Sequence, residues 1–115
     1  MSRGWLRALG YFPIYIILIG LAAGMWSRPL LLTGCYVVLG GVMLVRWHSR
    51  SDVGFFFLAG VLGPLGEIIG VRFGAWHYTL PWIDIPVWLP LGWAVAGLYL
   101  KKTTEVLAGG VEKRS

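Results

Sequence analysis

Charged residues are scarce in this chain of 115 residues. Only 13% of its residues are Asp, Glu, Lys or Arg, and 57% are hydrophobic, whereas an ordinary soluble domain has about 25% charged residues. A soluble fold with so few charges would expose large apolar patches and tend to aggregate. The composition therefore argues against a soluble domain and predicts a protein whose main solvent is the lipid bilayer.

Cysteine and the common catalytic or cofactor motifs are also scarce. Cys35 is the single cysteine, so no internal disulfide can form, and no Cys/His spacing typical of a metal site occurs. The sequence has no HExxH or haem-attachment pattern, no phosphate-binding glycine loop and no nucleophile–base pair. We therefore expect no metal and no cofactor. The net charge is +5, but the basic residues flank apolar runs, so membrane topology explains them better than nucleic acid binding, which we do not expect.

Four apolar runs make up most of the chain, at residues 11–26, 29–45, 53–71 and 82–100. Each is close to the length of about 17–25 residues that a helix needs to cross a membrane. The sequence predicts an all-α membrane protein with a single integral domain over residues 1–115. We expect a bundle of four transmembrane helices, followed by a polar tail at 103–115 that frays without a fold of its own. The first run follows Arg3 and Arg7, as in a cleaved secretory signal, but we expect it to be retained as a span.

Two residues are expected to shape the third run. Asp52 comes just before Val53, where a carboxylate would cap the helix N-terminus and complement its positive end. Pro64 interrupts the run. Because proline removes the hydrogen bond to the carbonyl of Gly60 and clashes with that turn, we expect a kink in the third helix.

The basic residues predict how the chain is oriented in the membrane. With the N-terminus inside, the inner segments hold eight of the ten Lys and Arg residues, and the outer loops hold only Arg28 and Arg72. Positive residues accumulate on the cytoplasmic side of membrane proteins. We therefore expect cytoplasmic N- and C-termini in a multi-pass protein of the bacterial inner (plasma) membrane, with Glu67 about one turn below the outer surface.

A carboxylate lies within the third apolar run, on the same side as a series of glycines. At 100° per residue, five glycines fall in a sector of roughly 120° that also contains Glu67; they are Gly60, Gly63, Gly66, Gly70 and Gly74. Glycines let a neighbouring backbone approach closely, so this face is predicted to pack against other helices and to point Glu67 into the protein. An ionisable residue within a span is a candidate functional residue.

Two kinds of role are open to Glu67. It can be a structural carboxylate, either paired with Arg72 or Tyr78 or kept protonated by burial. It can also carry chemistry. A protonated acid in an apolar cavity is suited to donating a proton to a carbon–carbon double bond or a leaving group, and an ionised one is suited to proton relay or cation recognition.

Further polar and aromatic residues are predicted to gather near Glu67 at the outer face of the membrane. Most of them also have simpler explanations: Trp and Tyr anchor at membrane interfaces, arginine snorkels to head groups, histidine in a loop is usually solvated, and aspartate beside prolines favours turns. The residues concerned are Arg72, Trp76, His77, Tyr78, Trp82, Asp84 and Trp88.

The order of residues between Gly60 and Trp93 resembles a known family. The segments that carry the resemblance are Glu67-Ile68-Ile69-Gly70, Gly74-Ala75-Trp76-His77-Tyr78, Ile85-Pro86-Val87-Trp88-Leu89-Pro90 and Trp93. They resemble the second half of membrane-bound carotenoid-biosynthesis proteins of the bisanhydrobacterioruberin hydratase type, and are similar to short uncharacterised bacterial membrane proteins. The resemblance covers near a third of the chain. Those carotenoid proteins have more than four spans, so a complete isoprenoid tunnel would need two copies of this chain.

The resemblance implies an enzyme that acts on a lipid-soluble isoprenoid. It implies Glu67 as the general acid and Tyr78 as its hydrogen-bond partner, with Trp76, Trp88 and Trp93 as walls around a polyene. We take as candidate catalytic residues Glu67, Tyr78 and His77, and as candidate substrate-binding residues Arg72, Trp76, Asp84, Trp88 and Trp93.

Three functions are compatible with the sequence. The first is an accessory or structural component of the membrane or of a larger membrane complex, because short glycine-rich spans bury little surface alone and their small-residue faces favour partners. The second is the isoprenoid enzyme, and the third is a small transporter or proton-coupled channel that uses Glu67. The partners expected are the lipid bilayer, other membrane subunits or a second copy of the chain, and a hydrophobic isoprenoid ligand.

Overall fold

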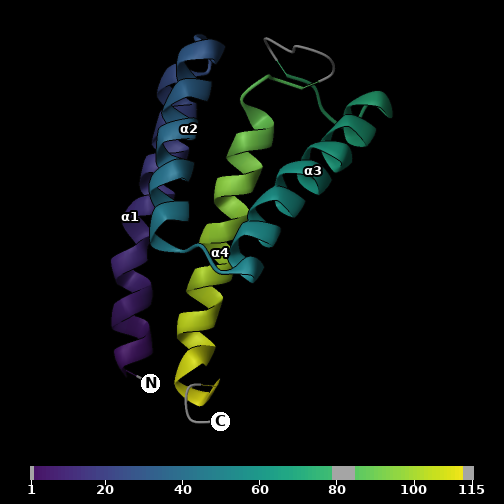
Figure 1. Ribbon diagram of the computed structural model, residues 1–115. Coiled ribbons are helices and arrows are strands. Elements are labelled where there is room, and N and C mark those ends of the chain that lie inside the picture. The colour runs from purple at the N-terminus through teal and green to yellow at the C-terminus, as the bar shows by residue number, and fades with distance from the viewer. Residues whose placement is uncertain (1, 79–84, 113–115) are drawn as a thin grey trace.

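The structure, a computed structural model, describes residues 2–78 and 85–112, with side chains from residue 4 to residue 108. These residues form four helices and no strand: α1 (Ser2–Met25), α2 (Pro29–Arg46), α3 (Arg50–Arg72) and α4 (Leu89–Glu112) (Figure 1). The prediction of an all-helical chain is confirmed. Three helices are long and apolar enough to cross a membrane, namely α1 from Gly4, α2 and α3.

Helix α4 does not have the composition of a complete span. Its apolar part ends at Leu100 and is followed by Lys101 and Lys102. It begins at Leu89, after a turn in which the Leu89 N–H donates to the Pro86 carbonyl at 3.1 Å, and not at residue 82 as predicted. Residues 82–84 of that predicted span lie outside the described residues. The structure therefore supports three membrane-crossing helices and an all-α fold, and a fourth crossing stays a prediction.

The prediction of a frayed polar tail from residue 103 is wrong, since α4 continues to Glu112. Glu105 forms ion pairs with Lys101 and Lys102, four and three residues earlier in the same helix, and such pairs stabilise a helix. The last turns of α4 also pack closely on α1, where a Cβ atom at Gly4 would lie 3.0 Å from the Val106 carbonyl oxygen. Helix α1 begins at Ser2, ahead of the apolar run that starts at Tyr11.

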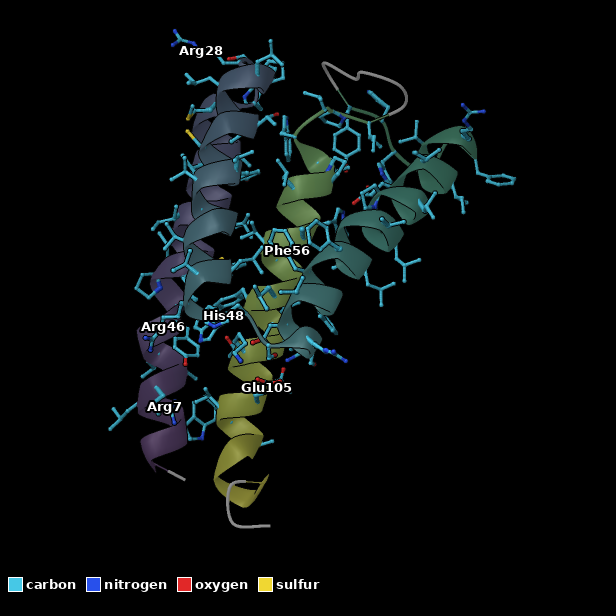
Figure 2. The ribbon with its side chains drawn as sticks, viewed as in Figure 1. Arg7, Arg28, Arg46, His48, Phe56 and Glu105 are labelled. Atoms are coloured by element: carbon cyan, nitrogen blue, oxygen red, sulfur yellow. The ribbon has the colours of Figure 1, made fainter. Side chains whose placement is uncertain are left out.

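Helix α4 is the central element, because it packs against each of the other three helices. Helices α1 and α2 lie side by side, whereas α3 leans away from them and packs along α4 (Figure 1). Both ends of the described chain lie at the same end of the bundle. Arg7 and Arg46 lie toward that end and Arg28 lies at the opposite one (Figure 2). Successive helices thus run in alternating directions, and the predicted orientation in the membrane assumes this arrangement.

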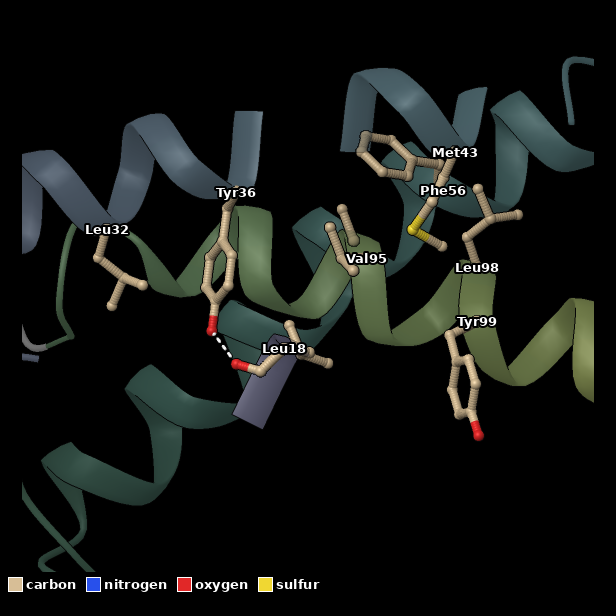
Figure 3. Packing of buried hydrophobic residues seen from close by; sticks show 9 residues of the cluster. Leu18, Leu32, Tyr36, Met43, Phe56, Val95, Leu98 and Tyr99 are labelled. Atoms are coloured by element: carbon tan, nitrogen blue, oxygen red, sulfur yellow. Dashed lines mark hydrogen bonds between the residues drawn. The ribbon is translucent and has the colours of Figure 1, made fainter. Parts of the chain in front are cut away.

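The hydrophobic core lies between α4 and the facing sides of α1, α2 and the first turns of α3 (Figure 3). Tyr36 of α2 is almost fully buried, and its hydroxyl donates to the Leu18 carbonyl of α1 at 2.7 Å. Phe56 of α3 reaches this core only because residue 40 is glycine: a Cβ atom there would lie 2.9 Å from the Phe56 ring. Pro64 lies inside α3 and is buried, and the kink expected there stays a prediction.

Candidate functional site

The carboxylate of Glu67, in the C-terminal half of α3, accepts three hydrogen bonds from described residues. Oε1 accepts from the indole Nε1 of Trp76 at 2.8 Å and from the hydroxyl of Tyr78 at 2.7 Å. Oε2 accepts from the indole Nε1 of Trp93 at 3.1 Å. Trp76 and Tyr78 come from the segment that follows α3, and Trp93 comes from α4. The carboxylate thus joins three parts of the chain, and we call this group of four residues the Glu67 site.

Two glycines make room for the indoles, one on each side of Glu67 along the helix. Gly63 and Gly70 lie about one turn before and after Glu67, on the same face of α3. A Cβ atom at Gly63 would lie 2.2 Å from the Trp93 ring, and one at Gly70 would lie 2.3 Å from the Trp76 ring. Both rings therefore rest directly on the α3 backbone, which places their N–H groups beside the carboxylate.

The predicted glycine face is only partly a helix-packing face. Gly60 does meet α4, since a Cβ atom there would lie 3.2 Å from that of Ala94. Gly63 and Gly70 receive tryptophan side chains in place of a helix backbone. A Cβ atom at Gly66 or Gly74 would meet nothing within 4 Å. Of the five glycines predicted to pack against helices, Gly60 and Gly63 therefore meet residues of α4, whereas packing of the other three against a helix stays a prediction.

Gly74 has a different role, which is to end α3 and reverse the chain. Its φ is +82°, a conformation that glycine adopts without steric cost. The N–H of Ala75 donates to the Gly70 carbonyl at 2.8 Å, and the N–H of Gly74 donates to the Val71 carbonyl at 3.0 Å. This pair of bonds is the Schellman motif of helix ends. The reversal brings Trp76 and Tyr78 back along α3 to the level of Glu67.

All three described donors to Glu67 are neutral N–H or O–H groups. Burial and the neighbouring Glu67 carboxylate raise the pKa of Tyr78 well above its usual value. Tyr78 therefore stays protonated and acts as a permanent donor to Glu67.

The remaining predicted site residues are not brought to the Glu67 carboxylate among the described contacts. His77 is exposed, and Arg72 is exposed at the end of α3 and engaged in an interaction. Trp88 packs edge-on against Tyr36 of α2, with ring centroids 6.1 Å apart, so it belongs to the core. Asp84 and Trp82 lie outside the described residues.

A second polar cluster lies near the start of α3, and sequence reasoning missed it. The Asp52 side chain is only 4% exposed, and the Lys101 ammonium of α4 lies 2.6 Å from its Oδ1. Lys102 lies 3.3 Å from the same oxygen, and Glu105 completes the group by contacting both lysines.

Hydrogen bonds from Lys101 and Lys102 lower the pKa of Glu105. Hydrogen bonds to Asp52 and Glu105 hold the pKa of Lys101 above its usual value, although burial acts in the opposite direction.

The predicted capping role of Asp52 is wrong. The helix is capped by Ser49, whose hydroxyl accepts from the Asp52 N–H at 3.0 Å. Asp52 lies inside the first turn, which leaves its carboxylate free to face α4. The spacing Ser49-x-x-Asp52 is itself typical of a helix start, so the sequence contained the signal for this cap.

No family model, no curated protein and no solved structure matches this chain. The resemblance to carotenoid-biosynthesis proteins therefore rests on the quoted residues alone. Function has to be argued from the geometry of the Glu67 site and from the surface of the bundle.

Proposed function

We propose that this chain is a small polytopic membrane protein that acts as an accessory or structural component of the membrane or of a larger membrane complex. The observation that carries the proposal is that the Glu67 carboxylate joins three segments of the chain through hydrogen bonds. Its three described hydrogen bonds connect α3, the segment after it and α4. A carboxyl group with partners on three segments braces this end of the bundle, which suits a structural role.

The uncovered surface of the bundle supports the same role. In the apolar windows of α1, α2 and α3, only 11%, 22% and 11% of the residues are buried. Helix α3 in particular presents a large exposed apolar surface, which includes Phe57, Leu58, Val61, Leu62, Leu65 and Ile69. Lipid or another membrane chain would cover this surface. We propose cytoplasmic termini for this component, on the basis of the eight basic residues in the segments at that end.

The test is whether the protein assembles, and whether assembly depends on Glu67. Cross-linking in native membranes, followed by purification in mild detergent, should yield a defined complex with another membrane protein or a second copy. Glu67→Gln should reduce that complex several-fold, because an amide nitrogen cannot accept the Trp93 hydrogen bond. Glu105→Gln is the matched control, since it also neutralises one carboxylate but at the other end of α4. A monomer with no cross-linked partner, or equal assembly of both variants, would contradict the proposal.

An enzyme acting on a lipid-soluble isoprenoid is the second candidate. It is favoured by one observation, the 2.7 Å hydrogen bond from Tyr78 to Glu67 beside two indole rings, which is the pairing that the resemblance implies. It ranks second because both carboxyl oxygens of Glu67 are already engaged in hydrogen bonds that hold three segments of the chain together. In this case Glu67→Gln should abolish an isoprenoid product of the host while the protein reaches the membrane in normal amount. An unchanged isoprenoid profile in that strain would dismiss the enzyme.

A further inference from the structure

The three described donors at the Glu67 site are all neutral groups, namely two indoles and a phenol. A carboxylate offers about four lone-pair positions for hydrogen bonds. Oε1 receives two donors and Oε2 receives one, at the longer distance of 3.1 Å. Among the described residues, one acceptor position on Oε2 therefore has no donor.

Aromatic rings lie beside the Glu67 carboxyl group and reach the surface of the bundle. The indoles of Trp76 and Trp93 each rest on α3 at a glycine, and they are 46% and 38% exposed. The faces of tryptophan and tyrosine rings attract cations, most strongly where water is partly excluded. A ligand at this place would therefore meet one carboxyl group and several aromatic rings.

We propose that the Glu67 site binds an organic cation, with its charged group at Oε2 and its apolar part against Trp76 and Trp93. The chemistry favours an organic cation over a metal ion, because hard metal ions need several oxygen ligands and the described residues offer no cluster of three or more acidic, histidine or cysteine side chains. Two sources can supply the same group: the ammonium of a lipid head group, or a free hydrophobic cation that enters from the membrane. The proposal goes beyond the scaffold role, since a braced bundle needs no ligand.

The test uses two probes of nearly equal shape and opposite charge. Tetraphenylphosphonium should bind the full-length protein saturably in a non-ionic detergent, as measured by equilibrium dialysis, and tetraphenylborate should not. Glu67→Gln should weaken tetraphenylphosphonium binding on the order of tenfold or more, since it removes the charge from a site of low dielectric. Glu105→Gln, which changes the other cluster, should leave binding unchanged. Saturable binding of both probes, or equal binding by the protein and Glu67→Gln, would overturn the proposal.

A second pair of variants, at Trp76, tests cation binding at the Glu67 site if Glu67→Gln does not fold. Trp76 lies in the segment after α3 and is largely exposed, so its replacement leaves the core intact. Trp76→Phe keeps a ring and should retain binding, whereas Trp76→Leu should weaken it about two- to fivefold, as expected for the loss of one cation–π contact. Equal binding by these two variants would contradict the aromatic contribution and with it the proposed site.

The source of the cation is resolved by adding lipids to the same assay. Competition by phosphatidylcholine but not by phosphatidylglycerol would assign the site to a lipid head group, and competition by neither would assign it to a free cation. Both results support the proposal, because both require cation binding at Glu67. Since assembly is measured by cross-linking and binding by dialysis, failure of the scaffold role and failure of the cation site can be told apart.

Discussion

Replacement of Asp52 by alanine is expected to destabilise the bundle by about 3 kcal/mol. The Asp52 carboxylate is nearly inaccessible, and Lys101 beside it is 11% exposed. Removal of one partner of a buried ion pair leaves the other charge uncompensated, which typically costs about 3–5 kcal/mol. The lower end of that range applies because Glu105 remains in contact with Lys101. Reversible unfolding in mixed detergent micelles, followed by circular dichroism, would measure the change.

Glu105→Gln provides the matched control for this experiment. It removes a carboxylate from the same cluster, but the Glu105 side chain is 43% exposed, and exposed pairs contribute at most about 1 kcal/mol. In a double-mutant cycle, Asp52→Ala combined with Lys101→Ala should cost less than the sum of the two single changes. Equal losses for Asp52→Ala and Glu105→Gln, or strictly additive effects, would show that Asp52 and Lys101 do not form a buried pair.

The sequence predicted the parts of the fold that depend on local hydropathy. Helices α2 and α3 begin and end within three residues of the runs predicted at 29–45 and 53–71, because apolar composition alone determines which segments favour lipid. The extent of α4 could not be predicted in the same way. Its last turns are held by ion pairs within the helix and by close packing on Gly4 of α1, and hydropathy reports neither.

The two polar sites differ in how far the sequence could predict them. Glu67, Trp76 and Tyr78 lie within one short stretch and were predicted to gather at one face of the membrane, but the chain reversal at Gly74 was not predicted. By contrast, Asp52 and Lys101 are 49 positions apart. Their contact follows only from two facts taken together: α3 and α4 pack side by side, and the start of one lies near the charged part of the other. Periodicity also could not show that Gly63 and Gly70 face indole rings, since it gives the direction of a side chain and not the neighbour it meets.

Gly63→Ala is expected to destabilise the protein by about 2–4 kcal/mol, although alanine is intrinsically the better helix former by about 1 kcal/mol. The new methyl group would lie 2.2 Å from the Trp93 ring, near the base of the side chain, so the whole indole must move. Overpacking of this kind costs about 1–3 kcal/mol, and the displaced indole also loses its hydrogen bond to the Glu67 carboxylate, worth about 1.5–3 kcal/mol. Unfolding measured as for Asp52, together with a change in tryptophan fluorescence, would report both effects.

Gly66→Ala is the control that separates packing from helix propensity. It makes the same chemical change three residues later in the same helix, where a Cβ atom would meet nothing within 4 Å. It should therefore be neutral or slightly stabilising, and should leave the tryptophan fluorescence unchanged. If the two variants were equally stable, Trp93 would not rest on Gly63, and the Glu67 carboxylate would lose its only described link to α4. A loss confined to Gly63→Ala would instead show that a missing methyl group on α3 is what allows an indole of α4 to reach the carboxylate.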